Sequence, residues 1–199
     1  IRMNIDTTDK VLAERFHFWI KEISPKISPY SHKLNIKLIN NKFLKDLNKK
    51  KYHIYLRNVK KQIEIYREEN IPLFTEMKAK QQEYGKISAK MTIKIDGNDI
   101  TMQQAALLLK DNNRKKREQI FKKIEKRRLK DEKNLDDLYD ELIVLRNKIA
   151  KNANFDNYRD YMFAAMGRFD YTPEDCFNFH KAIEKEIVPI INCFEQKRK

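Results

Sequence analysis

The chain has 199 residues, of which 36% are charged, three are glycine and five are proline. Such a composition favours a mainly helical protein with enough residues for a sizeable core. Two cysteines, Cys176 and Cys193, exclude a disulfide framework, and no apolar run approaches the ~20 residues that a membrane span needs. We therefore expect free thiols, a cytoplasmic location and no membrane partner.

The charge is strongly basic, with 43 Lys and Arg against 29 Asp and Glu and a net charge of +14. Residues 110–133 hold 12 basic and 5 acidic side chains. This segment could bind nucleic acid or an acidic partner. However, Phe121 is its only aromatic residue, and no helix-turn-helix, zinc-finger or RNA-recognition signature accompanies it. A solvated helical face is therefore favoured over a nucleic-acid site.

The first 90 residues show apolar residues at helical spacing, which predicts four up-and-down antiparallel helices over about 8–23, 29–40, 52–69 and 72–89. The segment SPKISP, residues 24–29, is expected to break the first helix, and Pro29 suits the first turn of the second. The expected inward-facing residues are Leu12, Phe16, Trp19, Ile23, Tyr30, Leu34, Leu38, Tyr55, Val59, Ile63 and Tyr66.

A β-hairpin is predicted in the segment MTIKIDGNDITM, residues 91–102. Apolar and polar residues alternate there, and Asp96-Gly97 supplies the turn. Thr101 and Gln104 form a capping box, so a helix should begin directly after the hairpin.

Residues 112–151 carry apolar residues at alternating three- and four-residue spacing, which predicts one long helix. Arg128 and Asp131 interrupt the apolar stripe. Either the helix leaves its neighbours at this point, or the two charges pair in a partly buried position. The first alternative is favoured. The inward residues expected are Phe121, Ile124, Leu135, Leu138, Leu142, Leu145 and Ile149.

A sharply defined corner follows in residues 154–175. The pattern predicts a turn at Asn154, a cap at Asp156, a short helix, a stop at Gly167, and a new helix capped by Thr172 with Pro173 in its first turn. Pro189 predicts a kink in that helix.

The residues RFDY between the stop and the new helix are held on a short connection, which makes them candidates for contact with a ligand. The alternative is a corner whose aromatic residues plug the core. The candidate residues are Arg168, Asp170 and Tyr171, with Tyr158 and Arg159 as further ones.

The segments GRFDYTPEDC, MTIKIDG and REENIP, with the sequence around them, resemble the oligoendopeptidase F family of thimet-oligopeptidase-like zinc metallopeptidases over essentially all 199 residues. The resemblance implies an all-α, two-lobed peptidase with a channel that admits short unfolded peptides. It also implies a zinc site made by HExxH and a later Glu, in which the motif Glu is the general base.

The sequence itself contains no HExxH. His17, His32, His53 and His180 are separated by 15, 21 and 127 residues, so none forms a zinc pair by local spacing. His180 and Glu184 share a helix face, but with no third ligand they are expected to be a surface polar pair. We assign no catalytic residue and no metal ligand, and we expect zinc only in the complete enzyme.

The resemblance, together with the absence of HExxH, implies the N-terminal lobe of the peptidase. We expect residues 1–90 to form a helical bundle, and residues 91–199 to form the hairpin, long helix and corner helices of the same lobe, continuing into a missing C-terminal catalytic part. By itself this lobe should be inactive. The alternative function is a non-catalytic basic helical module that binds an acidic partner or RNA.

Overall fold

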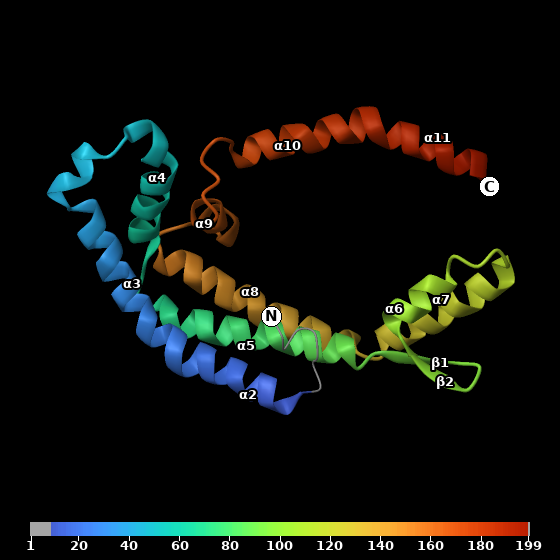
Figure 1. The fold of residues 1–199 in the computed structure, drawn as a ribbon. Coiled ribbons are helices and arrows are strands. Elements are labelled where there is room, and N and C mark those ends of the chain that lie inside the picture. The colour runs from blue at the N-terminus through green and yellow to red at the C-terminus, as the bar shows by residue number, and fades with distance from the viewer. Residues whose placement is uncertain (1–8, 199) are drawn as a thin grey trace. The chain divides into compact units, whose positions relative to one another are not determined.

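The computed structural model describes residues 9–198, which form helices and a single two-stranded hairpin (Figure 1). The expected all-α fold with a small hairpin is therefore confirmed. The described chain divides into two compact units. Unit 1 combines residues up to 31 with residues 67–152, and unit 2 combines residues 32–66 with those from 153 onward. The expected division into residues 1–90 and 91–199 stays a prediction. Each compact unit combines an early segment of the chain with a late one.

The elements of unit 1 are α2 (Lys10–Phe18), the π-helical η1 (Trp19–Ile23), the first half of α3 (Ser24–Ile39), α5 (Asn70–Ala89), β1 (Thr92–Ile95), β2 (Asn98–Thr101), α6 (Met102–Leu108), α7 (Arg114–Leu129) and α8 (Glu132–Asn152). The elements of unit 2 are the second half of α3, the 3-10 helix η2 (Lys42–Asp46), α4 (Lys49–Ile65), α9 (Tyr158–Ala165), α10 (Pro173–Ala182), the π-helical η3 (Ile183–Ile187) and α11 (Val188–Arg198).

The expected break at residues 24–29 is wrong, because helical structure continues through them into α3 and Pro29 lies inside that helix. A π-helical segment precedes Pro25, and the Ser24 amide donates to the Trp19 carbonyl, five residues back. A proline inside a helix removes one amide and crowds a carbonyl of the preceding turn. The wider π-helical turn gives the backbone room for the proline ring, so the helix continues. The local sequence pattern did not reveal this π-helical turn.

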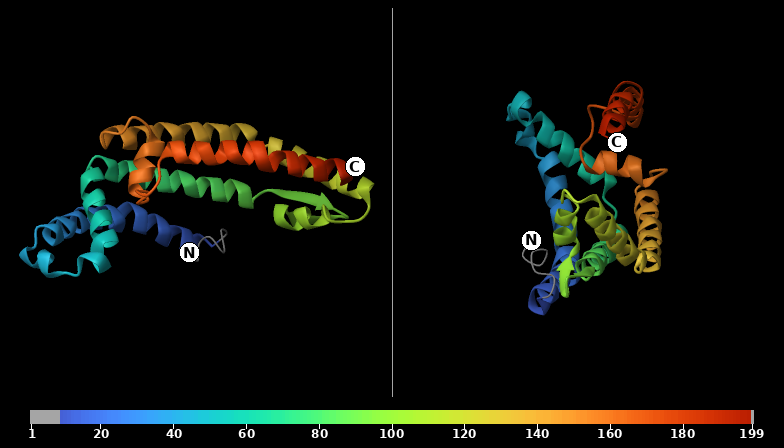
Figure 2. Two further views of the ribbon diagram at one scale, coloured as in Figure 1. Left: turned by 90° about the horizontal axis from the view of Figure 1, so that it is seen from above. Right: turned by 90° about the vertical axis from the view of Figure 1, so that its right-hand side faces the viewer.

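The main core of unit 1 lies between α5 and α8, which run side by side (Figures 1 and 2). On α8 the predicted inward residues Leu138, Leu142, Leu145 and Ile149 are all buried. Leu73 and Met77 face them from α5. This apolar stripe provides the main stabilisation of the unit, because burial of apolar area drives helix packing.

Asn70 is the one polar residue buried in the described chain, and it connects the same two helices. Its Nδ2 donates to the Ile149 carbonyl at 3.0 Å, and its Oδ1 accepts from Asn152 Nδ2 at 2.8 Å. The Asn70 side chain therefore meets the rule that buried polar groups are hydrogen-bonded.

The hairpin forms as predicted, with β1 and β2 antiparallel and Thr92 opposite Thr101. Asp96 and Gly97 both have positive φ, 49° and 84°, as a two-residue I′ turn requires. The predicted capping box of Thr101 and Gln104 starts α6. At this end of α5 (Figure 2), Ile93 packs with Ala105, Ile120 and Ile124 in a second small core.

The single long helix predicted over 112–151 is wrong, because α7 ends at Leu129 and α8 begins at Glu132. Asp131 at the break pairs with Arg127, not with Arg128, and both side chains of this pair are only about one-fifth exposed, at 20% and 21%. Arg128 pairs with Glu125 instead. The second alternative, a pair between Arg128 and Asp131, is therefore also wrong. Asp131 is partly buried and is paired with Arg127, because a buried charge must be paired to be tolerated.

Several apolar residues that were expected to face inward are exposed. Tyr30, Leu34 and Tyr55 are 68%, 66% and 55% exposed, and Phe121 is 54% exposed. Val59 on α4 is buried, as predicted. Helical spacing identifies an apolar face but does not show whether another element covers it.

Candidate functional site: the corner between α9 and α10

The corner, residues 167–173, begins with a tightly closed helix end. The Arg168 amide donates to the Phe163 carbonyl at 2.9 Å, and the Gly167 amide to the Ala164 carbonyl at 3.1 Å. Gly167 has a φ of +67°, which allows the chain to reverse at this point. The predicted glycine stop is confirmed, and so is the Thr172 cap with Pro173 in the first turn. The cap of α9 is Asn157, not Asp156, because the Asn157 oxygen accepts from the Asp160 amide.

Gly167 lies directly against α4. A Cβ atom at this position would come within 2.9 Å of Asn58 Oδ1, which is closer than side-chain carbons approach such an atom. A small pocket of about 100 Å³ lies at the contact, lined by Asn58, Gln62, Ala164, Ala165, Met166 and Gly167. The contact ties the corner to α4 within unit 2.

Asp170 is bound by Arg57 of α4. Arg57 donates from Nη1 to Oδ1 at 3.0 Å and from Nη2 to Oδ2 at 3.3 Å. The same guanidinium lies 4.5 Å from the centre of the Phe169 ring. The hydrogen bond from Arg57, together with its charge, holds the pKa of the Asp170 carboxyl below its ordinary value. The Asp170 side chain nevertheless remains 76% exposed, so it is open to solvent on its other side.

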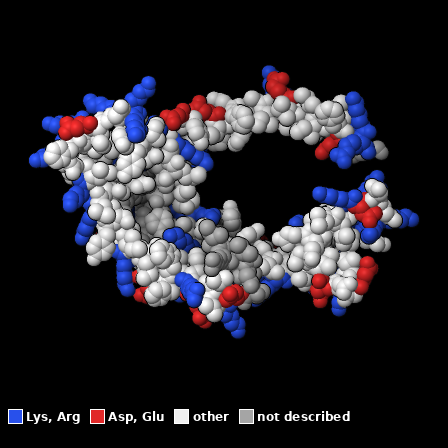
Figure 3. Space-filling model, viewed as in Figure 1, with Lys and Arg blue, Asp and Glu red and all other residues white. Residues whose placement is uncertain are grey.

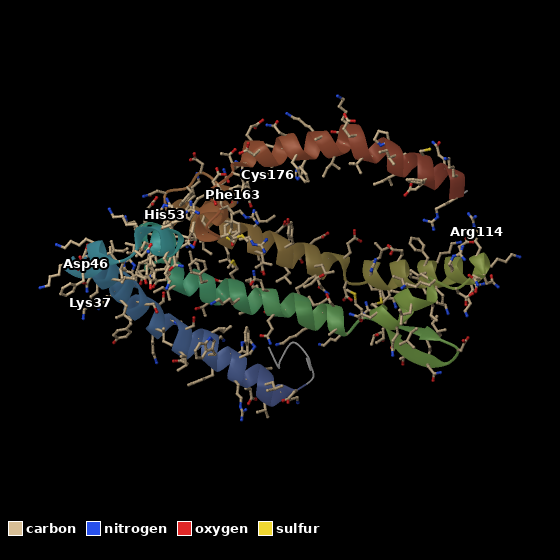
Figure 4. All side chains as sticks on the ribbon, turned by 45° about the horizontal axis from the view of Figure 1, so that its top comes forward. Lys37, Asp46, His53, Arg114, Phe163 and Cys176 are labelled. Atoms are coloured by element: carbon tan, nitrogen blue, oxygen red, sulfur yellow. The ribbon has the colours of Figure 1, made fainter. Side chains whose placement is uncertain are left out.

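Arg168 and Tyr171 both contact Phe163 of α9, which is labelled in Figure 4. The Arg168 guanidinium lies 5.1 Å from the centre of that ring, and the Tyr171 ring meets it edge-on at 5.7 Å. Arg168 is half-buried and Tyr171 is 44% exposed. Three sequence-predicted candidates thus lie on one connection, where aromatic packing and exposed surface occur together.

Tyr158 and Arg159 lie at the start of α9 and have different neighbours. Tyr158 stacks on Tyr161, whose pKa burial raises to about 12, with a smaller contribution from Tyr158. Arg159 Nε donates to Asp160 Oδ1 at 2.8 Å, and its guanidinium lies 5.8 Å from the Phe177 ring centre. The ion pair of Arg159 is thus made with its neighbour Asp160 in the first turn of α9.

The sequence did not identify Arg57, Asn58 or Phe163 as contacts of the corner. Arg57 and Asp170 are 113 residues apart, so no local spacing relates them. The available signal was the glycine stop, since a residue at positive φ next to a helix often marks a close backbone approach.

The described residues do not fit a zinc site. Among positions 9–198, no group of three or more His, Cys, Asp or Glu side chains lies together in a way that could hold a metal ion. Cys176 and Cys193 are free, as expected. No described helix combines the length and apolarity needed to cross a bilayer. We therefore derive no catalytic step from residues of this chain.

Comparison with known protein families gives two matches that belong together. Residues 1–66 match the peptidase M3 N-terminal domain, and residues 107–199 match peptidase family M3. Together the two matches cover more than half of the chain. The chain belongs to peptidase family M3.

Solved structures of similar fold agree with this family. A protein from Bacillus anthracis strain Ames, assigned as an oligoendopeptidase F, is 26% identical over 98% of this M3 chain, with a TM-score of 0.90. PZ peptidase A, solved with an inhibitor, is 25% identical over 95% of the chain, with a TM-score of 0.88. A second structure assigned as oligoendopeptidase F is 23% identical over 98% of the chain and shares the fold, with a TM-score of 0.92. Comparison with curated proteins gives no significant match.

The M3 chain spans about a third of the length of these solved relatives, at 36%, 34% and 34%. The family and the helical fold of the segment are therefore established, while the activity of a whole peptidase is a matter for proposal.

Proposed function

We propose that this M3 chain is the N-terminal part of a cytoplasmic zinc metalloendopeptidase and lines the channel that receives short, unfolded peptides. The observation that supports the proposal is the pair of family matches, which follow one another along the chain in the order N-terminal domain, then peptidase. The names of two solved relatives, oligoendopeptidase F and PZ peptidase A, agree with peptide substrates.

We propose that the chain by itself does not hydrolyse peptides. A zinc peptidase needs ligands that hold the metal and a base that activates its water. This sequence has no HExxH, so the zinc and its ligands would belong to a C-terminal catalytic part that acts as the partner of this chain.

The corner supplies the channel-wall candidates. Tyr171 offers a partly exposed ring, Asp170 an exposed carboxylate, and Arg168 a guanidinium held over Phe163. Each is fixed by a neighbour, so little side-chain freedom would be lost on contact with a peptide. Tyr158 and Arg159 are further candidates at the start of α9.

The test uses a quenched fluorescent peptide with added zinc. The 199-residue chain alone should give no turnover, and mixing or fusing it with an HExxH-bearing M3 catalytic part should produce zinc-dependent cleavage. In the assembled enzyme, Tyr171→Ala should raise KM with the folded state intact. Zinc-dependent turnover by the 199-residue chain alone would contradict the proposal.

A further inference from the structure

A groove in unit 1 runs between strand β1 and helix α7. It has a volume of about 350 Å³ and is lined by Thr92, Ile93, Lys94, Lys123, Lys126, Arg127 and Lys130. Five of the seven lining residues are therefore cationic. We call this set of residues the basic groove. It combines part of the basic segment, residues 110–133, with residues of β1, so it exists only in the folded chain, where the hairpin packs on α7.

Four of the five cations that line the basic groove have no acidic partner in the described chain. Lys123 Nζ donates to the Lys94 carbonyl at 3.0 Å, so its partner is a neutral group. Arg127 pairs with Asp131 and is the only lining cation in an ion pair with a described residue. The ammonium groups of Lys94, Lys126 and Lys130 make no ion pair with any described residue.

Some other cations on or beside α7 have acidic partners. Lys116 pairs with Asp111 at 2.7 Å, and Lys122 pairs with Glu118 at 2.6 Å. In the basic groove, Lys123, Lys126 and Lys130 all lack an acidic partner among the described residues. A concentration of one sign of charge in a concave surface attracts an anionic partner.

The shape and chemistry of the basic groove favour a peptide over a nucleic acid. Its lining contains no aromatic ring, so a base has nothing to stack on. Lys126 lies in the last turn of α7, and Lys130 is the C-cap of the same helix with α-helical φ and ψ, which places them about 6 Å apart along the helix axis. In an extended peptide, side chains two residues apart lie on one face at a separation of about 6.6 Å. The separation of the two lysines and the spacing of side chains on one face of the peptide therefore match closely.

We propose that the basic groove binds an extended acidic peptide segment with carboxylates at alternating positions, as in Glu-x-Glu. Lys126 and Lys130 receive the two carboxylates, and Lys123, held by the Lys94 carbonyl, adds a third cation on the same side of α7. Thr92, Ile93 and the aliphatic stems of the lysines contact the peptide between its charges. This binding goes beyond the proposed channel function and requires neither zinc nor cleavage.

The test measures fluorescence anisotropy of a rhodamine-labelled peptide with alternating Glu and Ser, titrated with the 199-residue chain at 50 mM and 200 mM NaCl. The matched peptide carries Gln in place of Glu. We expect the Glu peptide to bind at least tenfold more tightly than the Gln peptide at low salt, and the difference to shrink at high salt because surface charges are screened.

The double variant Lys126→Gln/Lys130→Gln should weaken binding of the Glu peptide about tenfold. Its control, Lys115→Gln/Lys133→Gln, changes net charge by the same amount at exposed positions outside the basic groove and should have little effect. All four substituted lysines are exposed, and circular dichroism checks that each variant remains folded.

Three outcomes would overturn the proposal: equal binding of the Glu and Gln peptides, equal losses in the two double variants, or tighter binding of single-stranded RNA that depends on Lys126 and Lys130. The second outcome would indicate diffuse attraction to a basic protein, and the third a nucleic-acid site. None of them depends on peptide hydrolysis, so failure here is distinguishable from failure of the proposed peptidase function.

Discussion

Gly167 is the residue on which the geometry of the corner depends most directly. It combines a φ of +67° with a position where a Cβ atom would meet Asn58 Oδ1 at 2.9 Å. A residue with a side chain would incur both the left-handed backbone cost and a steric clash with α4. The sequence predicted the helix stop, but the second constraint is visible only in the folded chain.

We expect Gly167→Ala to lower the free energy of unfolding by about 1–2 kcal/mol from the backbone conformation alone, with the clash adding to it. Chemical denaturation measures the change. Adding Asn58→Ser to Gly167→Ala should recover the part that is due to the clash.

The matched control is Gly85→Ala. Gly85 lies inside α5, and a Cβ atom added there would meet nothing within 4 Å, so alanine should stabilise the protein by roughly 0.5–1 kcal/mol. If both alanine variants changed stability in the same direction, the explanation for Gly167 would be wrong.

At the level of the elements, prolines and π-helical segments occur together twice. η1 is followed by Pro25, and η3 is followed by Pro189, in each case at the second residue of the next α-helix. In both segments the amide directly after the π-helical turn donates five residues back, from Ser24 to Trp19 and from Val188 to Ile183. The same local solution therefore admits a proline into two long helical stretches.

The pairing of α5 with α8 depends on a polar contact as well as an apolar stripe. Asn70 is 1% exposed and uses both ends of its amide to hold residues at the end of α8. Removing it leaves a buried carbonyl and a partly buried amide without partners, and that loss is more costly than the hydrogen bonds themselves are worth.

We expect Asn70→Ala to lower the free energy of unfolding by about 2 kcal/mol, measured by urea denaturation. The control Asn147→Ala removes an exposed asparagine from α8 and should change stability by no more than about 0.5 kcal/mol. A similar small effect for both variants would show that the Asn70 contacts contribute little.

At the scale of the whole molecule, the C-terminal helices are far more exposed to solvent than the pair α5 and α8. From Phe177 to Arg198, every residue except Ile183 is exposed, including Phe179 at 64% and Phe194 at 61%. Most of the surface of α10 and α11 seen in Figure 3 is uncharged. A helix without tertiary packing is only marginally stable in water.

Hydrogen exchange followed by mass spectrometry should therefore show two regions of the 199-residue chain with different amide exchange rates. Amides of α10 and α11 should exchange within seconds, whereas those of α8 near Leu142 and Ile149 should be protected for far longer. Equal protection of both regions would contradict the expectation. Repeating the measurement at tenfold lower protein concentration tests whether self-association is responsible.

The sequence by itself determined the family and the elements that depend on residues close together in the chain. The Asp96-Gly97 turn, the Thr101 and Thr172 caps and the Gly167 stop all form as predicted. Each uses hydrogen bonds or backbone conformations within a few residues, so the local pattern contains the necessary information.

Tertiary structure alone decided which of these elements meet. The binding of Asp170 by Arg57 spans 113 residues and the contact of Asn70 with Ile149 spans 79. It also decided that Tyr30 and Leu34 are exposed and that α7 and α8 separate at Asp131. These outcomes follow from packing between distant segments, and a helical repeat specifies a face without specifying its partner.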